Sequence, residues 1–359
     1  AFLYGPNLYW VIVRKALISR RYNTVIMKRI VYLLFLVMCI SSCKNQKVDD
    51  VYTAFPESHT LTAEIHQIPP IMLNPRGMYL LDSSLVVFND GLDTCFQVFD
   101  RNSLEYRYSF GLKGNGPEDF NMPSGDVVYN RQGEVAILDV NMLKVISFKD
   151  GHPVVGTRKI PAQNSYYNGL ISLNDSLFVC NGDFEDTKEF MFIHGDGTLE
   201  LKVDYPEGID RFGSILQRNQ AYEHMAVARP SGDRFASFYT FQRAFRIINE
   251  EGDILKNVTL AIEPFDEQIP VDDEQRRIHV LSVRATQDYI YTLNLDMTPE
   301  EIYQQKSFPS IQVYSWDGEP VKKYNLDRFI SSFTIDESSQ MIYGAFAEKE
   351  DEIYVFRMK

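Results

Sequence analysis

The sequence predicts an all-β fold, a six-bladed β-propeller closed by an N-terminal strand. Three observations predict it. A pattern of alternating apolar strands recurs six times, an Asp-Gly type of turn follows most of the copies, and the last copy ends before its outer strand. The repeats occupy residues 60–359, a span of 300 residues. Units of about 50 residues match the repeat length of known four-stranded propeller blades.

Each unit contains three strands that the pattern of apolar residues marks directly. We expect the first strands at residues 78–81, 127–129, 170–173, 225–228, 280–283 and 330–335. The second strands are expected at residues 85–89, 135–139, 177–181, 235–239, 290–294 and 341–346. The third strands are expected at residues 96–100, 145–151, 191–197, 245–252, 311–318 and 353–358. Because Asp-Gly between alternating apolar runs is a strong hairpin signal, an outer strand is expected after the turn in the first five units.

The sixth unit reaches Lys359 without an outer strand of its own. Ahead of the first unit, the segment from Leu61 to Ile68 alternates between apolar and polar residues and has no other unit to join. We expect this N-terminal segment to supply the missing strand. Its pairing would close the ring and protect the open edges of a linear array.

The first 43 residues have the organisation of an export signal. Met27, Lys28 and Arg29 open a basic segment, an apolar run follows from Ile30 to Ile40, and small residues precede Cys43. A basic start, a short apolar run and small residues are typical of a secretory signal peptide. The run is much shorter than the ~20 residues that span a bilayer, which disfavours a transmembrane helix.

Residues 40–43 resemble the lipobox of bacterial lipoproteins, in which the cysteine is lipidated and becomes the mature N-terminus. The alternative is an ordinary signal peptide with a chance cysteine. We expect residues 1–26 to be an upstream extension, residues 27–42 the signal peptide, and residues 43–59 the lipidated Cys43 and a tether. The expected location is the cell envelope, as an outer-membrane lipoprotein that faces the periplasm or the surface.

Residues 44–359 are strongly acidic. The first 43 residues hold six of the 36 lysines and arginines and none of the 49 acidic residues, so the remainder has a net charge near −19. Such a surface repels nucleic acid and anionic headgroups, so the lipid on Cys43 would have to provide the membrane attachment. Cys95 and Cys180 lie inside apolar strands of different units and are expected to be buried free thiols.

Two stretches resemble known propeller families. Residues 111–123, followed by Gly133 to Val135, resemble an NHL-type repeat. Residues 313–318, with Tyr324 to Asp327 and Ile342-Tyr343, resemble the TolB-like six-bladed propeller lipoproteins of Bacteroidetes. The second resemblance covers roughly residues 60–359 and implies the same fold. It implies no settled activity that can be assigned to named residues.

The sequence lacks the motifs of common catalytic and metal sites. The glycines at positions 111, 114 and 116 are not followed by the Lys-Ser/Thr of a phosphate-binding loop, and they fit a tight turn between units instead. The six histidines show no metal-ligand spacing. A resemblance to gluconolactonase-like enzymes keeps one alternative open, a propeller hydrolase or lyase with a central calcium ion. Its candidate ligands are Glu118, Asp119 and Asp139.

Long connections between strands are expected on one face of the ring. They are residues 111–124, 161–168, 206–224, 262–277 and 295–310. In an up-and-down blade these connections emerge on the same face, and insertions on one face usually mark the binding face. The candidate ligand-binding residues of this face are Arg76, Lys113, Asn115, Tyr166, Tyr167, Arg211, Arg218, Tyr222, Tyr239, Arg243 and Arg277. Aromatic and arginine side chains suit a carbohydrate, a peptide or an anionic small molecule, unless they pack and pair within the loops.

These observations together predict a membrane-anchored, non-enzymatic protein without a cofactor. Its long-loop face is expected to bind a ligand or a partner protein. The calcium-dependent hydrolase or lyase is one alternative. The other is a structural accessory subunit of an envelope complex, by analogy with TolB, and analogy of fold is a weak guide to function.

Overall fold

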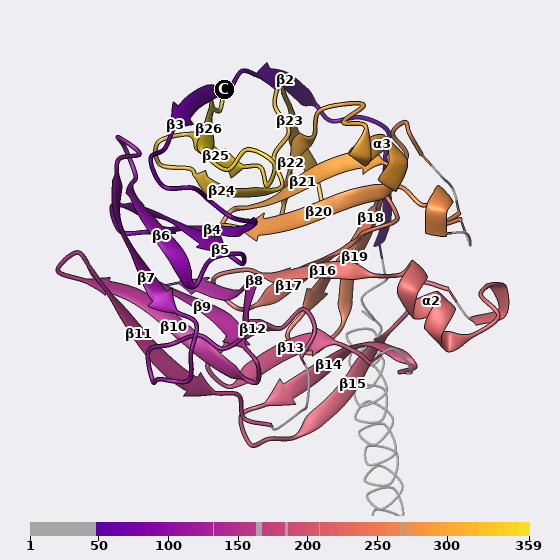
Figure 1. Cartoon of the computed structure of the whole chain (residues 1–359). Coiled ribbons are helices and arrows are strands. Elements are labelled where there is room, and N and C mark those ends of the chain that lie inside the picture. Colours follow the sequence, from indigo (N-terminus) through magenta and orange to yellow (C-terminus); the bar gives the residue numbers. More distant parts are fainter. Residues whose placement is uncertain are drawn as a thin grey trace, which may run out of the picture. The chain divides into compact units, whose positions relative to one another are not determined.

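The computed structural model describes residues 48–359 apart from Gln132, residues 163–166, 184–185, Gly208, and residues 266–267 and 271–272. The chain divides into two units, residues 1–47 and residues 48–359. The predicted signal peptide and Cys43 belong to the first unit and lie outside the described residues. The second unit is a ring of β-sheets around a central axis (Figure 1).

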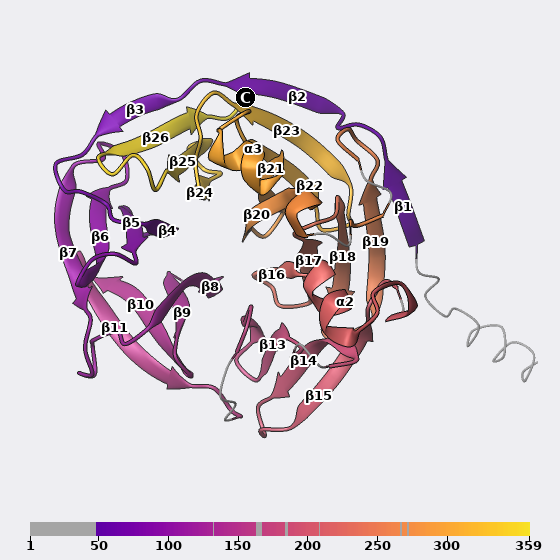
Figure 2. The same ribbon diagram turned by 45° about the vertical axis from the view of Figure 1, so that its right-hand side comes forward.

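The described part of the ring contains six antiparallel blades, each with its first strand innermost (Figure 2). Blade 1 consists of β4 (Pro75–Leu81), β5 (Ser84–Asn89), β6 (Thr94–Asp100) and β7 (Tyr106–Leu112). Blade 2 consists of β8 (Pro123–Arg131), β9 (Glu134–Asp139), β10 (Met142–Lys149) and β11 (His152–Lys159). Blade 3 consists of β12 (Ile171–Asn174), β13 (Leu177–Asn181), β14 (Lys188–His194) and β15 (Leu199–Asp204).

The second half of the ring repeats this arrangement. Blade 4 contains β16 (His224–Ala228), β17 (Arg234–Tyr239), β18 (Ala244–Asn249) and β19 (Ile254–Leu260). Blade 5 contains β20 (Ile278–Ala285), β21 (Tyr289–Met297), β22 (Ser310–Ser315) and β23 (Pro320–Leu326). Blade 6 contains β24 (Ser332–Asp336), β25 (Met341–Ala345) and β26 (Glu352–Arg357). The predicted all-β, six-bladed fold and its three strand families are confirmed.

The N-terminal segment, residues 48–67, follows the outer edges of blades 4, 5 and 6 and is named the belt (Figure 2). β1 (Val48–Tyr52) pairs in parallel with β19, β2 (Glu57–Leu61) pairs in parallel with β23, and β3 (Glu64–Gln67) completes blade 6 against β26. β3 lies within residues 61–68, where the closing strand is expected. Residues 48–59, expected as part of the tether, instead form β1 and most of β2, because the outer edges of β19 and β23 offer free backbone partners.

Apolar side chains pack between neighbouring blades, because successive residues of a strand point to opposite faces of its sheet. Phe96 of blade 1, for example, lies with its ring centroid 4.9 Å from that of Phe120, at the entrance to blade 2. Cys95 and Cys180 are buried and free, as predicted. Among the described residues, no helix is long and apolar enough to cross a bilayer.

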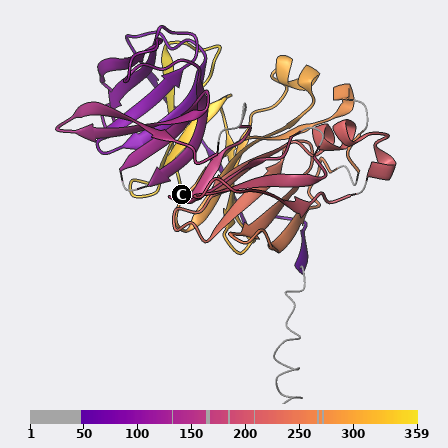
Figure 3. The same cartoon turned by 90° about the horizontal axis from the view of Figure 1, so that it is seen from below.

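Short helices occupy the long connections, on the side of the ring named the long-loop face (Figure 3). The 3-10 helix η1 (Ile209–Arg211) and α2 (Ile215–Ala221) lie between β15 and β16. A second 3-10 helix, η2 (Asp273–Gln275), lies between β19 and β20, and α3 (Pro299–Tyr303) lies between β21 and β22. The hydroxyls of Ser214 and Thr298 cap the first turns of α2 and α3. The long connections therefore lie where the sequence predicts them.

Candidate functional site

A central channel of about 270 Å³ runs between the innermost strands of the six blades. Its wall includes residues of β4, β8, β12, β16, β20 and β24. Each of these strands is hydrogen-bonded to a neighbour on one side only, so the backbone N–H and C=O groups of its free edge face the channel. These backbone groups make the channel polar, whereas its charge depends on the side chains that line it.

Arg284, near the end of β20, is the arginine of the channel wall without an acidic partner among the described residues. Its Nε donates to the carbonyl of Phe333 at 3.1 Å, and its Nη1 donates to the carbonyl of Val283 at 2.8 Å and to Ser282 Oγ at 3.1 Å. All these acceptors are neutral, and in the described part of the chain no carboxylate forms an ion pair with Arg284. Burial lowers the pKa of Arg284, whereas Tyr79 and, to a smaller extent, the charge of Asp126 act to raise it.

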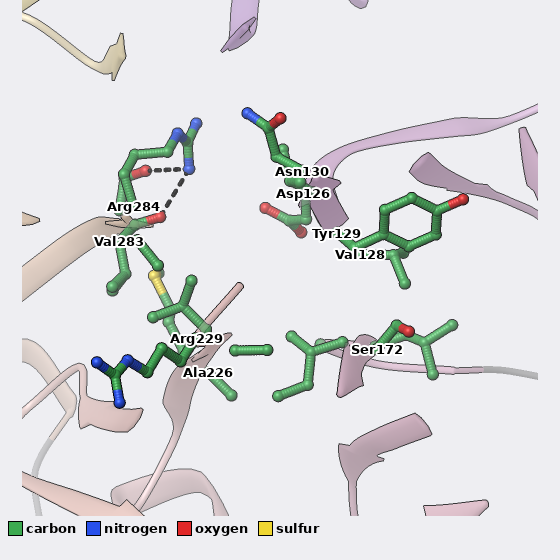
Figure 4. Close-up of a pocket in the computed structure, with 18 of the residues that line it drawn as sticks. Asp126, Val128, Tyr129, Asn130, Ser172, Ala226, Arg229, Val283 and Arg284 are labelled. Atoms are coloured by element: carbon green, nitrogen blue, oxygen red, sulfur yellow. Dashed lines mark hydrogen bonds between the residues drawn. The ribbon is translucent and has the colours of Figure 1, made fainter. Parts of the chain in front are cut away.

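Asp126 and Asn130 of β8 point toward the same space as Arg284 (Figure 4). β8 belongs to blade 2 and β20 to blade 5, so in a ring of six blades these side chains come from opposite walls. Both Asp126 and Asn130 are exposed, and neither side chain has a hydrogen-bond partner among the residues that the structure describes. A cation, an anion and an amide therefore face a common space without contacting one another.

The other two arginines of the channel wall already have acidic partners. Arg131 Nη2 lies 3.1 Å from Asp175 Oδ1. Arg229 Nη1 lies 3.4 Å from Asp233 Oδ2, and Figure 4 shows its guanidinium directed away from the centre of the channel. Arg284 therefore differs from both neighbours in having no counter-charge in direct contact.

The sequence-predicted ligand residues of blade 1 and its following loop remain at the surface. Arg76 Nη1 lies 3.2 Å from Asp90 Oδ2, and Lys113 Nζ donates to the carbonyl of Asp90 at 2.7 Å. Asn115 is exposed. None of these three side chains lines the central channel.

Most of the other predicted ligand residues are closed off from solvent, which corrects the expectation that they contact a ligand. Tyr167, Tyr222, Tyr239, Arg218 and Arg243 are all buried. The hydroxyl of Tyr167 donates to the carbonyl of Ala162. Arg218 donates to Asn219 Oδ1 and lies 4.0 Å above the ring of Tyr205. The physical reason is that the long connections fold onto the blades and use these side chains to build their own small cores.

Arg211 and Arg277 are partly buried and paired. Arg211 Nη1 lies 3.1 Å from Glu207 Oε2, and its Nη2 donates to the carbonyl of Ile269. Arg277 Nη1 lies 2.7 Å from Glu301 Oε2, at the start of α3. Tyr166 lies outside the described residues.

Glu189 is the centre of a buried charged cluster between blades 3 and 4. Its Oε2 lies 2.8 Å from Arg246 Nη1, and its Oε1 lies 3.6 Å from His224 Nδ1. His224 Nδ1 is also 2.9 Å from the carbonyl of Tyr222. Burial, reinforced by the negative charge of Glu189, raises the pKa of Tyr239 well above its ordinary value. The cluster joins the two blades through buried side chains, and His224 also lines the central channel.

A second buried cluster joins blades 4 and 5. Arg243 Nη2 lies 2.8 Å from Asp296 Oδ2, and His279 Nδ1 lies 2.8 Å from Asp296 Oδ1. Both basic side chains are almost completely buried, so Asp296 is their built-in counter-charge. Arg243, a predicted ligand residue, is therefore held inside the fold by an ion pair.

The proposed calcium ligands do not converge. Asp119 Oδ2 accepts from the backbone N–H of Gly116 at 2.8 Å and closes the turn that the nearby glycines make possible. Asp139 accepts from the backbone N–H groups of Asn121 and Met122. Glu118 is exposed. Within the described residues, no group of three His, Cys, Asp or Glu side chains is arranged to hold a metal ion.

Sequence reasoning missed Arg284, Asp126 and Asn130. One signal could have found them. Asp126 stands inside one first strand and Arg284 near the end of another, and charged residues in the strands that surround the centre of a ring are a reason to look for a site there. The strand positions alone do not say that blades 2 and 5 face each other, which requires the closed ring.

Six blades around a narrow polar channel define a six-bladed β-propeller with room for a small ligand. The family model described as TolB-like 6-blade propeller-like matches residues 54–338, and the chain belongs to this family. The match begins in the belt and ends after the first strand of blade 6, so it includes strands of all six blades.

Solved structures with the same architecture are distant in sequence. A putative exported protein from Bacteroides fragilis is 12% identical, with 88% of this chain and 100% of that chain covered and a TM-score of 0.52. A member of the duf4221 family from Bacteroides vulgatus is 13% identical, with 83% and 98% covered and a TM-score of 0.49. No curated protein matches the sequence. At such identities the first likeness shows a shared fold and transfers no function.

Proposed function

We propose that the protein is an exported, lipid-anchored binding protein that holds a small ligand by an anionic group in its central channel. Arg284 carries this proposal, because it lines the channel and its guanidinium donates to neutral acceptors only. An enclosed charge is costly unless an opposite charge or a complete set of hydrogen bonds compensates it. A bound anion supplies that compensation through charge-assisted hydrogen bonds.

The dimensions of the channel support a small ligand. Its volume of about 270 Å³ lies just below the ~300–1,000 Å³ of sites that enclose drug-sized molecules. The free backbone edges of the innermost strands offer further donors and acceptors around the ligand. The long-loop face is a weaker candidate for this role, because Arg218, Tyr222, Tyr239 and Arg243 are buried there.

The anionic ligand can be tested with acetate and inorganic phosphate as probes and the full chain in detergent as the sample. Thermal unfolding is expected to shift upward with the bound probe, by about 2.7 kcal/mol of added stability at a concentration 100 times Kd. Arg284→Gln should abolish the shift. Arg229→Gln is the matched control, because Arg229 also lies in the channel wall but pairs with Asp233 and points away.

Two outcomes would contradict the proposal. The first is an equal response of wild type and Arg284→Gln to every probe. The second is stoichiometric calcium in the purified protein, which would favour the hydrolase or lyase with a central metal ion.

Membrane attachment through Cys43 is the second part of the proposal. The basic, apolar and small-residue order of residues 27–43 supports it, as does the acidity of the rest of the chain, which opposes attachment by charge. The similar Bacteroides fragilis protein is itself described as a putative exported protein, which is in line with export. Cys43→Ala should move the protein from the membrane fraction to the soluble fraction and remove incorporation of labelled palmitate. Retention of the label in this variant would contradict lipidation at Cys43.

Docking of an envelope protein on the long-loop face is a second candidate function. Large apolar side chains stand exposed there, with Met122 at 74%, Tyr303 at 87% and Phe308 at 53% exposure. Exposed apolar side chains are typical of a contact site when they form one cluster. Met122 lies in one loop, whereas Tyr303 and Phe308 lie in another. Crosslinking of envelope extracts through a photoreactive residue at position 303 tests this candidate, and the absence of any crosslinked partner counts against it.

A further inference from the structure

We propose that the channel ligand is a zwitterion of the amino-acid type, with its carboxylate on Arg284 and its ammonium group on Asp126. This inference rests on the proposed function, because it takes the channel as the binding site and Arg284 as the anion-binding group. It adds the second charge of the ligand and the residue that recognises it.

One donor nitrogen of Arg284 is free to bind a carboxylate. A guanidinium has five N–H donors in a fixed fork. Nε and Nη1 already donate to Phe333, Val283 and Ser282, whereas Nη2 has no acceptor among the described residues. Figure 4 shows the guanidinium directed into the space between β20 and β8. A carboxylate in this space can accept from Nη2 and neutralise the charge.

Asp126 offers the complementary group. Its carboxylate is exposed and accepts no hydrogen bond from any side chain or N–H group in the described part of the chain. It faces Arg284 from the opposite wall, and the two charges influence each other without forming an ion pair. The gap between them is therefore available to a ligand that presents an acceptor on one side and a donor on the other. The amide of Asn130 lies beside Asp126 and can bind either end.

The charge balance of the two walls favours a zwitterion over a simple anion or a simple cation. An anion would neutralise Arg284 but would bring its charge close to Asp126. A cation would have the reverse effect. A ligand with both charges can pair with Arg284 and with Asp126. A ligand with one charge places it beside a like charge on one wall, and such repulsion is a recognised source of specificity.

Part of the wall is apolar, and the exposed Glu223 also lines it. Met225, Ala226 and Val283 contribute apolar surface to the same channel. Burial of such surface against an aliphatic group is favourable. The two remaining arginines of the wall are paired with Asp175 and Asp233, so they do not compete for the carboxylate. We therefore expect a free amino acid with an uncharged, aliphatic side chain.

Calorimetry on the full chain in detergent tests this inference with three probes of the same shape. L-Leucine carries both charges, 4-methylpentanoate lacks the ammonium group, and 3-methylbutylamine lacks the carboxylate. Leucine is expected to bind roughly 10- to 100-fold more tightly than either analogue, the range that one charge-assisted hydrogen bond provides. Asp126→Asn should weaken leucine to the level of 4-methylpentanoate and leave 4-methylpentanoate unchanged or tighter. Arg284→Gln should weaken both carboxylates.

The outcomes separate this inference from the proposed function. If 4-methylpentanoate binds as tightly as leucine and Asp126→Asn changes neither, the zwitterion is overturned and the anion site stands. If Arg284→Gln weakens nothing, both proposals are overturned. Absence of binding by leucine, alanine, valine and isoleucine to the wild type overturns the zwitterion, and the acetate and phosphate titrations then decide the anion site alone. Unchanged melting temperatures of the unliganded variants exclude misfolding as the cause of lost binding.

Discussion

The arginines between blades and the arginine of the channel differ in where their counter-charge comes from. Arg246 lies 2.8 Å from a carboxylate oxygen of Glu189, and Arg243 lies 2.8 Å from one of Asp296. Arg284 contacts two carbonyls and a hydroxyl. A guanidinium whose counter-charge is part of the fold serves stability. One whose counter-charge must come from outside is available for a ligand.

The comparison also explains why residue type was a poor guide to the site. Arginines and tyrosines are abundant in the long connections, but there they build the cores that hold these connections on the blades. Arg218 over the ring of Tyr205 is an example. What distinguishes Arg284 is that it has no acidic partner, and only the three-dimensional structure reveals this.

The largest effect is expected when Arg246 is replaced by methionine. Arg246→Met leaves Glu189 as a fully buried carboxylate without its guanidinium partner. Breaking one side of a buried ion pair typically costs about 3–5 kcal/mol. Urea unfolding at neutral pH measures this loss as a decrease in the free energy of unfolding.

The double variant Glu189→Leu with Arg246→Met is the control. It removes both charges, and replacement of a buried pair by apolar residues is often close to neutral, so much of the loss should be recovered. If Arg246→Met lowers the free energy of unfolding by less than about 1 kcal/mol, another group compensates the charge of Glu189. The conclusion that the arginines between blades serve stability would then be wrong.

A much smaller effect on stability is expected for Arg284→Met. This change removes a charge that has no carboxylate partner, but it also removes the donor to the carbonyl of Phe333. The two effects oppose each other, so the free energy of unfolding of the unliganded protein should change by less than about 1 kcal/mol. The same urea titration, without added anions, measures it. A loss as large as that of Arg246→Met would place Arg284 among the structural arginines.

The fold could be predicted from sequence because it repeats. Six copies of the same strand order leave few alternatives, and the incomplete sixth copy points to an N-terminal closing strand. The belt strands β1 and β2 could not be predicted in the same way. They pair with the outer edges of blades 4 and 5, which are already complete four-stranded units, so nothing in the repeat pattern requires them.

The face that carries the long connections could also be predicted, because strand order fixes the side from which each connection emerges. The site could not be. Arg284 and Asp126 are 158 positions apart in the chain, in blades 5 and 2, and their separation in sequence says nothing about their facing each other. Only closure of the ring brings them to opposite walls of one channel.

The smallest effect is expected at the partly buried ion pair of Arg277 and Glu301 on the long-loop face. Hydrogen bonds from the Lys306 ammonium and the backbone N–H of Thr298 lower the pKa of Glu301 from 4.5 to about 2. A lowered pKa means that the contribution of Glu301 to stability is fully present above pH 4.5 and is lost as the pH falls toward 2.

Glu301→Gln should therefore cost no more than about 1 kcal/mol at neutral pH, because both side chains still contact solvent, which screens the pair. The difference from wild type should shrink steadily as the pH falls from 4.5 toward 2. Thermal unfolding of both proteins over this pH range measures the difference directly. A difference that stayed constant with pH would mean that the charge of Glu301 is not what stabilises α3. The cap by Thr298 would then hold the helix by itself, and Arg277 would be available to a ligand on the long-loop face.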